Sequence, residues 1–179
     1  FIRLYTSRYR RWLSPKFLAG ESYGTTRAAG LSGYLQERHG LWLNGVMLVS
    51  SILDFQTADF DPGNDLPHLL FLPTYTATAW YHQRLPADLQ ALPLADVLAQ
   101  AEAFALGDYA LALLQGAALP AQRHVDIVHQ LVRFTGLSQD YVERNDLRID
   151  IFRFIKELLR QQRRTVGRLD SRYTGIDRD

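Results

Sequence analysis

Two short apolar segments separated by a helical pattern constrain the fold of this chain more than any other feature of its sequence. Residues 16–19 form a mostly apolar run between Pro15 and Gly20, and residues 43–53 form a longer one with several β-branched side chains. Residues 25–38, between them, place apolar side chains at helical spacing. A strand, a helix and a strand within about 40 residues predict one parallel βαβ unit, whose second strand we expect to be buried on both faces.

Helical periodicity dominates the rest of the chain. After a turn-rich segment at residues 60–65, no second alternating strand pattern follows. The expected helices cover residues 1–12, 66–84, 94–115, 121–135, 138–145 and 149–164. We expect Pro73 to kink or divide the second of these, and Gly107 to mark a break. The fold class that follows is α/β, with a strand–helix–strand unit followed by a mostly helical block.

Composition narrows the possible functions. A net charge of +1 gives no general reason to expect nucleic acid as a partner, and we read no apolar run as long enough to span a membrane. The absence of cysteine excludes disulfides, thiolate metal sites and cysteine nucleophiles. No histidines and carboxylates have metal-ligand spacing, so we expect neither a metal nor another cofactor. The chain opens on Phe1 without a signal peptide, and we read it as a piece of a longer protein whose compartment stays unassigned.

The residues Gly20-Glu21-Ser22-Tyr23-Gly24 match the pattern G-x-S-x-G at the point where the first strand meets the helix. In that setting the pattern is typical of a nucleophile elbow, a strained turn for which the two glycines supply room. Ser22 would be the nucleophile, and the Tyr23 backbone N–H would face the oxygen of a tetrahedral intermediate. The alternative is a glycine-rich turn with an incidental serine.

The residues around this motif extend the pattern. The segment Pro15-Lys16-Phe17-Leu18-Ala19 followed by the motif resembles the nucleophile segment of the serine carboxypeptidase family, α/β hydrolases that remove residues from peptide C-termini. Further segments resemble the bacterial branch of that family: residues 49–56, 77–82, 135–142 and 167–172.

The resemblance implies a fold and a domain organisation. Residues 1–54 would be part of the α/β-hydrolase core with its nucleophile elbow. Residues 55–166 would be a helical cap inserted into that core, and residues 167–179 would return to it. The chain would then be a fragment of an α/β hydrolase.

The resemblance also implies an activity: a serine carboxypeptidase that acts through an acyl-enzyme on Ser22. Its partners would be peptides with a free C-terminus. Glu21, the residue before the serine, would bind the terminal carboxylate if burial or a neighbouring carboxylate keeps it protonated. A surface glutamate at a helix N-terminus is the alternative.

The aspartate and histidine of the triad and the oxyanion-hole loop are missing from the expected places. Asp54 follows the second strand and is a possible acid, although a turn residue is the favoured interpretation. His39, His68 and His82 are better read as surface or structural residues, and His124 and His129 lie on different faces of one helix. We therefore expect the rest of the parent chain to supply these groups, and the 179 residues alone to be inactive.

Two other functions stay open on the same residues. One is a serine esterase or acyltransferase of the same fold, and the other is a degenerate relative that binds peptides without cleaving them.

Two further features are open to a functional or a structural interpretation. Residues 148–179 hold nine basic against five acidic side chains, which we interpret as a solvated helix end rather than a nucleic-acid surface. The aromatic residues Phe71, Tyr75, Trp80 and Tyr81 would line a substrate pocket or belong to an ordinary core.

Overall fold

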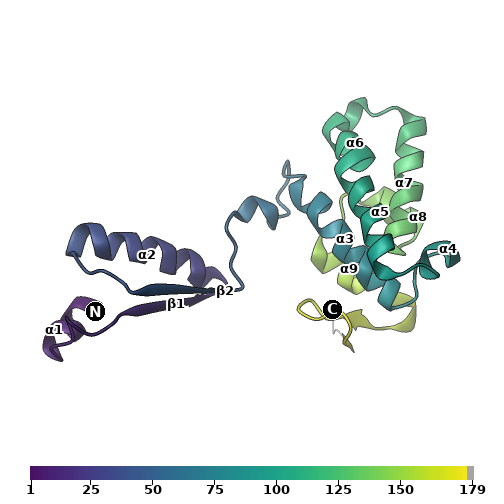
Figure 1. Ribbon diagram of the computed structural model, residues 1–179. Helices are drawn as coiled ribbons and strands as arrows, with labels where there is room; N and C mark the ends of the chain where they lie inside the picture. Colours follow the sequence, from purple (N-terminus) through teal and green to yellow (C-terminus); the bar gives the residue numbers. More distant parts are fainter. Residues whose placement is uncertain (177–179) are drawn as a thin grey trace. The chain divides into compact units, whose positions relative to one another are not determined.

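The computed structural model describes residues 1–176, and the chain divides into two compact units between Phe55 and Gln56 (Figure 1). We call residues 1–55 the N-terminal unit and residues 56–176 the C-terminal unit. The division falls next to the expected boundary between residues 54 and 55. Of the expected returning segment, residues 177–179 lie outside the described residues.

The N-terminal unit is a βαβ unit preceded by one short helix. Its elements are α1 (Ile2–Arg8), β1 (Phe17–Glu21), α2 (Tyr23–His39) and β2 (Gly45–Val49). The strands β1 and β2 pair in parallel, in a register that sets Phe17 opposite Gly45 and Glu21 opposite Val49. The helix α2 runs beside both strands (Figure 1). The predicted strand–helix–strand order is confirmed, and residues 1–176 as a whole contain mixed helix and small sheets.

The expectation that the second strand is buried on both faces is wrong for this unit. From Val46 to Val49 the four side chains are 40–53% exposed, although they alternate between the two faces of β2. The physical reason is that β2 has one hydrogen-bonded neighbour, β1, and one adjacent long helix, α2. A parallel strand becomes fully buried only where helices cover both faces of its sheet.

The C-terminal unit is almost entirely helical. Its elements are η1 (Phe55–Thr57, which begins at the boundary), α3 (Leu66–Tyr81), α4 (Ala87–Gln90), α5 (Leu94–Phe104), η2 (Ala105–Tyr109), α6 (Ala110–Gln115), η3 (Gly116–Ala118), α7 (Ala121–Thr135), α8 (Gln139–Arg144), α9 (Ile151–Glu157) and η4 (Arg160–Gln162), followed by the short antiparallel pair β3 (Thr165–Val166) and β4 (Thr174–Gly175). Its core lies where α3, α5 and α7 pack together, around side chains such as Leu72, Val97 and Leu131.

Several helix boundaries differ from the prediction. The helix α3 continues through Pro73 without a division, and at Gly107 the chain passes through the wider π-helical turn η2 instead of breaking. The helix expected over residues 149–164 ends at Glu157. The strands β3 and β4 were not predicted, because two residues each are too few to show an alternating pattern.

The continuous stretch from Leu94 to Ala118 bears on the expectation that nothing spans a membrane. By length and composition alone it is apolar enough to cross one, and a third of its most apolar window is buried within the structure. That buried part includes Val97, Ala101 and Tyr109, which belong to the core of the C-terminal unit.

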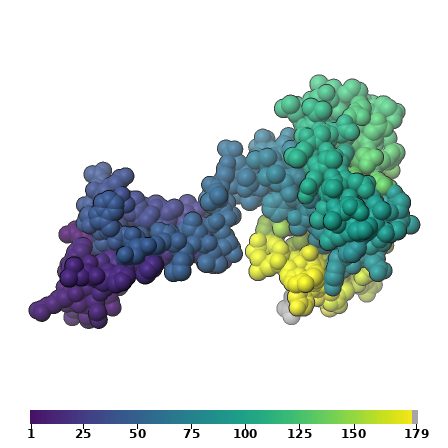
Figure 2. All heavy atoms as spheres, viewed as in Figure 1, coloured from purple at the N-terminus to yellow at the C-terminus, as the bar shows by residue number. Residues whose placement is uncertain are grey.

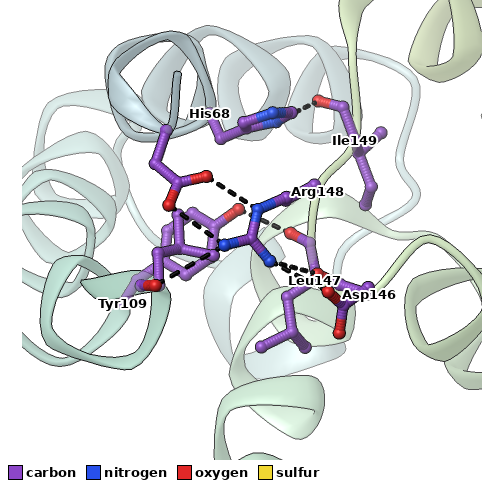
Figure 3. Close-up of polar contacts among 8 residues, drawn as sticks. His68, Tyr109, Asp146, Leu147, Arg148 and Ile149 are labelled. Carbon is purple, nitrogen blue, oxygen red and sulfur yellow. Dashed lines mark hydrogen bonds and ion pairs between the residues drawn. The ribbon is translucent and has the colours of Figure 1, made fainter. Parts of the chain in front are cut away.

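A polar network joins residues 146–149 to the helices around them (Figure 3). The Arg148 guanidinium donates to both carboxylate oxygens of Asp65 at 2.7 and 3.0 Å, and Asp146 is a second partner. The Tyr109 hydroxyl donates to the Leu147 carbonyl at 2.6 Å. These bonds hold a segment whose residues 146 and 147 both have positive φ, so the network stabilises a strained turn.

The C-terminal segment packs on the end of α3. The Thr78 hydroxyl donates to the Ser171 hydroxyl, and His82 Nε2 lies 2.7 Å from the Ser171 carbonyl. Figure 2 shows these last residues, in yellow, gathered at one end of the C-terminal unit.

Candidate active site

Ser22 has the backbone conformation that most clearly distinguishes the site. It lies between the last residue of β1 and the first residue of α2, with φ at 52° and ψ at −123°. A non-glycine residue in this region costs about 1–3 kcal/mol, and residues strained in this way cluster at active sites and ligand clamps. The Ser22 side chain is exposed and does not cap the helix.

Backbone hydrogen bonds hold Ser22 from both sides. Its N–H donates to the Val49 carbonyl at 3.0 Å, which ties the turn to the end of β2. Its carbonyl accepts from the Thr25 N–H at 2.9 Å and from the Thr25 hydroxyl at 2.6 Å. We did not single out Val49 or Thr25 in the sequence. The threonine three residues after the serine was the available signal, because such hydroxyls bond to nearby backbone carbonyls.

Only one of the two motif glycines is required by close packing. A Cβ on Gly20 would lie 2.1 Å from the Gly24 carbonyl oxygen and 2.8 Å from the Thr25 nitrogen, so no side chain fits there. A Cβ on Gly24 would meet nothing within 4 Å. We expected both glycines to be needed because a side chain would not fit. That expectation is confirmed for Gly20 and is wrong for Gly24, where a Cβ would contact no atom.

The two residues that flank Ser22 are exposed. Glu21 ends β1 opposite Val49. Among the described residues, its side chain has neither a hydrogen-bond donor nor a second carboxylate as a partner. Tyr23 begins α2, so its N–H has no acceptor within the helix. Its ring contacts Phe55, with the two centroids 6.2 Å apart. The Tyr23 N–H is thus a free backbone donor next to the Ser22 hydroxyl.

Of the two candidate triad partners in the N-terminal unit, the structure places His39 far from Ser22. Asp54 lies five residues beyond Val49, in a loop, so the expectation that it stands at the strand end is wrong. His39 is the last of the 17 residues of α2, roughly 25 Å along the axis from the end that holds Ser22. Its Nδ1 lies 3.3 Å from Arg3 Nη1.

The other histidines belong to the C-terminal unit, where two of them bond to backbone. His68 is buried, and its Nδ1 lies 3.3 Å from the Ile149 carbonyl. His82 bonds to Ser171 as described above, which fits the structural role expected for both. His124 is half-buried and lines a small cavity of about 390 Å³, and His129 is exposed on the same helix, α7.

The aromatic cluster of the C-terminal unit is mainly core. Tyr75 is buried and stacks on Phe154 at a centroid distance of 4.1 Å, and Phe71 and Trp80 pack against the same core. Tyr81 is exposed. Among residues 1–176, no group of three or more histidine, aspartate or glutamate side chains is arranged to hold a metal ion.

No family model, characterised protein or solved structure matches this sequence. The functional interpretation therefore depends on the geometry at Ser22 and on the residues around it.

Proposed function

We propose that Ser22 is the nucleophile of a serine hydrolase of the α/β class. The observation that carries the proposal is the positive φ of a serine at a strand–helix junction, two residues after a glycine that close packing requires. This is the turn that a G-x-S-x-G nucleophile needs, because it lifts the hydroxyl clear of the strand and the helix. The free N–H of Tyr23 supports a role as one oxyanion donor.

The proposed reaction is acyl transfer to Ser22 followed by hydrolysis. A histidine removes the proton from the Ser22 hydroxyl as it attacks the scissile carbonyl, and later returns that proton to the leaving group. An aspartate orients the histidine. We propose that parts of the protein beyond these 179 residues supply both, as the resemblance to serine carboxypeptidases implies.

The finer proposal is that the substrate is a peptide with a free C-terminus. Its support is the position of Glu21 directly before the nucleophile. Glu21 is exposed in the described structure, so the proposal requires a carboxyl partner from the rest of the protein to keep it protonated. A protonated Glu21 would donate a hydrogen bond to the terminal carboxylate of the substrate.

Covalent labelling of the full-length protein tests the nucleophile. We expect an organophosphonate probe to modify Ser22 stoichiometrically, and Ser22→Ala to abolish that labelling. Ser50 is the matched control, because it also has a positive φ and follows β2 at the same edge of the sheet. Ser50→Ala should label as the natural protein does, and modification of Ser50 instead of Ser22 would overturn the assignment.

Paired peptides test the substrate class. If Glu21 binds the terminal carboxylate, kcat/KM for a free-acid peptide should exceed that for its amide by about 10- to 150-fold, the value of one charge-assisted hydrogen bond. Glu21→Ala should lose most of this preference, and Glu21→Gln, which keeps a donor, should retain it. Equal rates for acid and amide would favour the esterase or acyltransferase, and labelling without any turnover would favour the peptide-binding relative.

A further inference from the structure

The C-terminal unit contains a groove of about 930 Å³, which lies at the upper end of the range of about 300–1,000 Å³ for ligand pockets. The groove is lined by residues 58–61, by Tyr141 of α8, by Asp150 and one face of α9, and by Arg160, residues 163–165 and Ile176. Its size is suited to a ligand of several residues rather than to a single small ion.

Five cations line this groove: Arg153, Lys156, Arg160, Arg163 and Arg164. Arg160 pairs with Glu157 through one nitrogen, which leaves its other donors open, and its side chain is 76% exposed. Arg163 has a left-handed backbone, with φ at 55°, and its side chain has no ion-pair partner among residues 1–176. Five of the nine basic residues of the segment 148–179 thus line one concave surface, where Arg153 also pairs with Asp150.

Apolar side chains line the same groove beside the cations. Phe152 is 60% exposed although it lies on α9, and Ile176 is exposed as well. Phe60 contributes a ring from the opposite end of the unit's sequence and packs against His68 and Phe71. Open aromatic and aliphatic surface between arginines suits a ligand that alternates charged and apolar groups.

Carboxylates among the lining residues favour an acidic peptide over a nucleic acid as the ligand. Asp59, Asp61, Asp150 and Glu157 also line the groove. A nucleic acid carries a phosphate at every nucleotide, so these four carboxylates would repel part of its backbone. In a peptide, uncharged residues can separate the carboxylate side chains, and the backbone N–H groups can donate hydrogen bonds to the carboxylates of the groove.

We propose that this groove binds a peptide segment whose carboxylate side chains are separated by apolar ones. The carboxylates pair with Arg160 and Arg163, and the apolar side chains pack on Phe152 and Ile176. This site is separate from Ser22 in the chain, and its occupation does not require the hydrolase function.

Fluorescence anisotropy with a designed peptide tests the proposal on the full chain. The probe is a fluorescein-labelled peptide of alternating glutamate and phenylalanine with an amidated C-terminus, so that recognition of a free terminus plays no part. We expect saturable binding at low salt that weakens as salt rises. Arg160→Gln and Arg163→Gln should each weaken binding about two- to five-fold, as measured for exposed ion pairs. Phe152→Ala should weaken it by about two- to ten-fold.

Matched controls make the test specific. Arg144 is also 76% exposed and pairs with a single carboxylate, Asp140, but does not line the groove, so Arg144→Gln should bind as the natural protein does. A peptide with glutamine in place of glutamate should bind much more weakly. The proposal is overturned if the acidic peptide does not bind, if Arg144→Gln weakens binding as much as Arg160→Gln, or if a single-stranded oligonucleotide binds more tightly at the same arginines.

Discussion

Ser22 and Gly116 adopt the same backbone conformation, with φ and ψ of 52° and −123° at the serine and 50° and −124° at the glycine. Glycine enters this region without steric cost, and at the end of α6 the chain uses it. Between β1 and α2 the chain holds a serine in the same conformation. The hydrogen bonds of Ser22 to Val49 and Thr25 therefore sustain a backbone strain that a glycine would remove.

Replacement of Ser22 by glycine tests this strain. We expect Ser22→Gly to stabilise the N-terminal unit by about 1 kcal/mol relative to Ser22→Ala, because only glycine relieves the positive φ. Hydrogen exchange of the α2 amides measures the change within that unit. Gly116→Ala should show the opposite sign, with a loss of stability in the C-terminal unit. The strain is absent if the two variants at position 22 exchange at equal rates.

The two motif glycines should respond differently to the same substitution. Gly20→Ala should destabilise the N-terminal unit by about 1–3 kcal/mol or more, because its Cβ collides with the backbone of Gly24 and Thr25. Gly24→Ala meets no atom and lies in a helix, so it should be neutral or stabilise by about 0.5–1 kcal/mol. Urea unfolding followed by the fluorescence of Trp12 and Trp42 compares them. Equal losses in both variants would contradict the close approach at Gly20.

The half-buried ion pair of the C-terminal unit should matter more than its exposed ones. Arg148 and Asp65 are each about 30% exposed and share two hydrogen bonds, which fix residues 146–150 to α3. We expect Arg148→Gln to lower the free energy of unfolding by about 1–2 kcal/mol, after allowance for solvent screening. Arg144→Gln, which removes an exposed pair, should change it by less than about 0.5 kcal/mol. If Arg148→Gln and Arg144→Gln lower the stability equally in thermal unfolding, partial burial does not strengthen the Arg148–Asp65 pair.

His68 should make the C-terminal unit sensitive to acid. Burial is the main cause that lowers the pKa of His68 below its ordinary value of 6.5, because the cationic form loses solvation. The unfolded chain therefore binds the proton at a higher pH than the folded one. Stability should be constant above about pH 6.5 and should fall as the pH decreases from there towards the folded-state pKa.

His68→Gln provides the comparison for that pH dependence. Glutamine donates to the Ile149 carbonyl but does not titrate, so thermal unfolding between pH 7.5 and 5.5 should vary less in this variant. His129→Gln, at an exposed position of α7, should keep the full pH dependence. If His68→Gln and the natural protein lose stability in parallel, another group is responsible.

The sequence predicted the elements with strong local signals. The strand–helix–strand order follows from the apolar periodicity of residues 16–53, and α7 begins and ends at the predicted residues, where Pro120 precedes it and Gly136 follows it. The conformation of Ser22 was also predictable, because a serine flanked by glycines between a strand and a helix has few other solutions.

Features that depend on tertiary contacts could not be predicted in this way. The helix α3 is not divided at Pro73, where a kink or a division was expected, and Gly107 lies in a π-helical turn. The ion pair of Arg148 with Asp65 joins residues 83 positions apart, and no local pattern connects them. The groove beside α9 likewise gathers residues from both ends of the C-terminal unit.

The exposed strand β2, which has one pairing partner, makes the N-terminal unit prone to self-association. Its Val-Met-Leu-Val segment, Val46 to Val49, presents apolar side chains on both faces beside a single parallel neighbour. A short apolar strand in this state is a template for other extended chains, including copies of itself. The Val49 carbonyl bonds Ser22 on the β1 side, so a copy that paired with the free edge of β2 would leave that bond in place. Self-association at high protein concentration would then leave the nucleophile conformation intact.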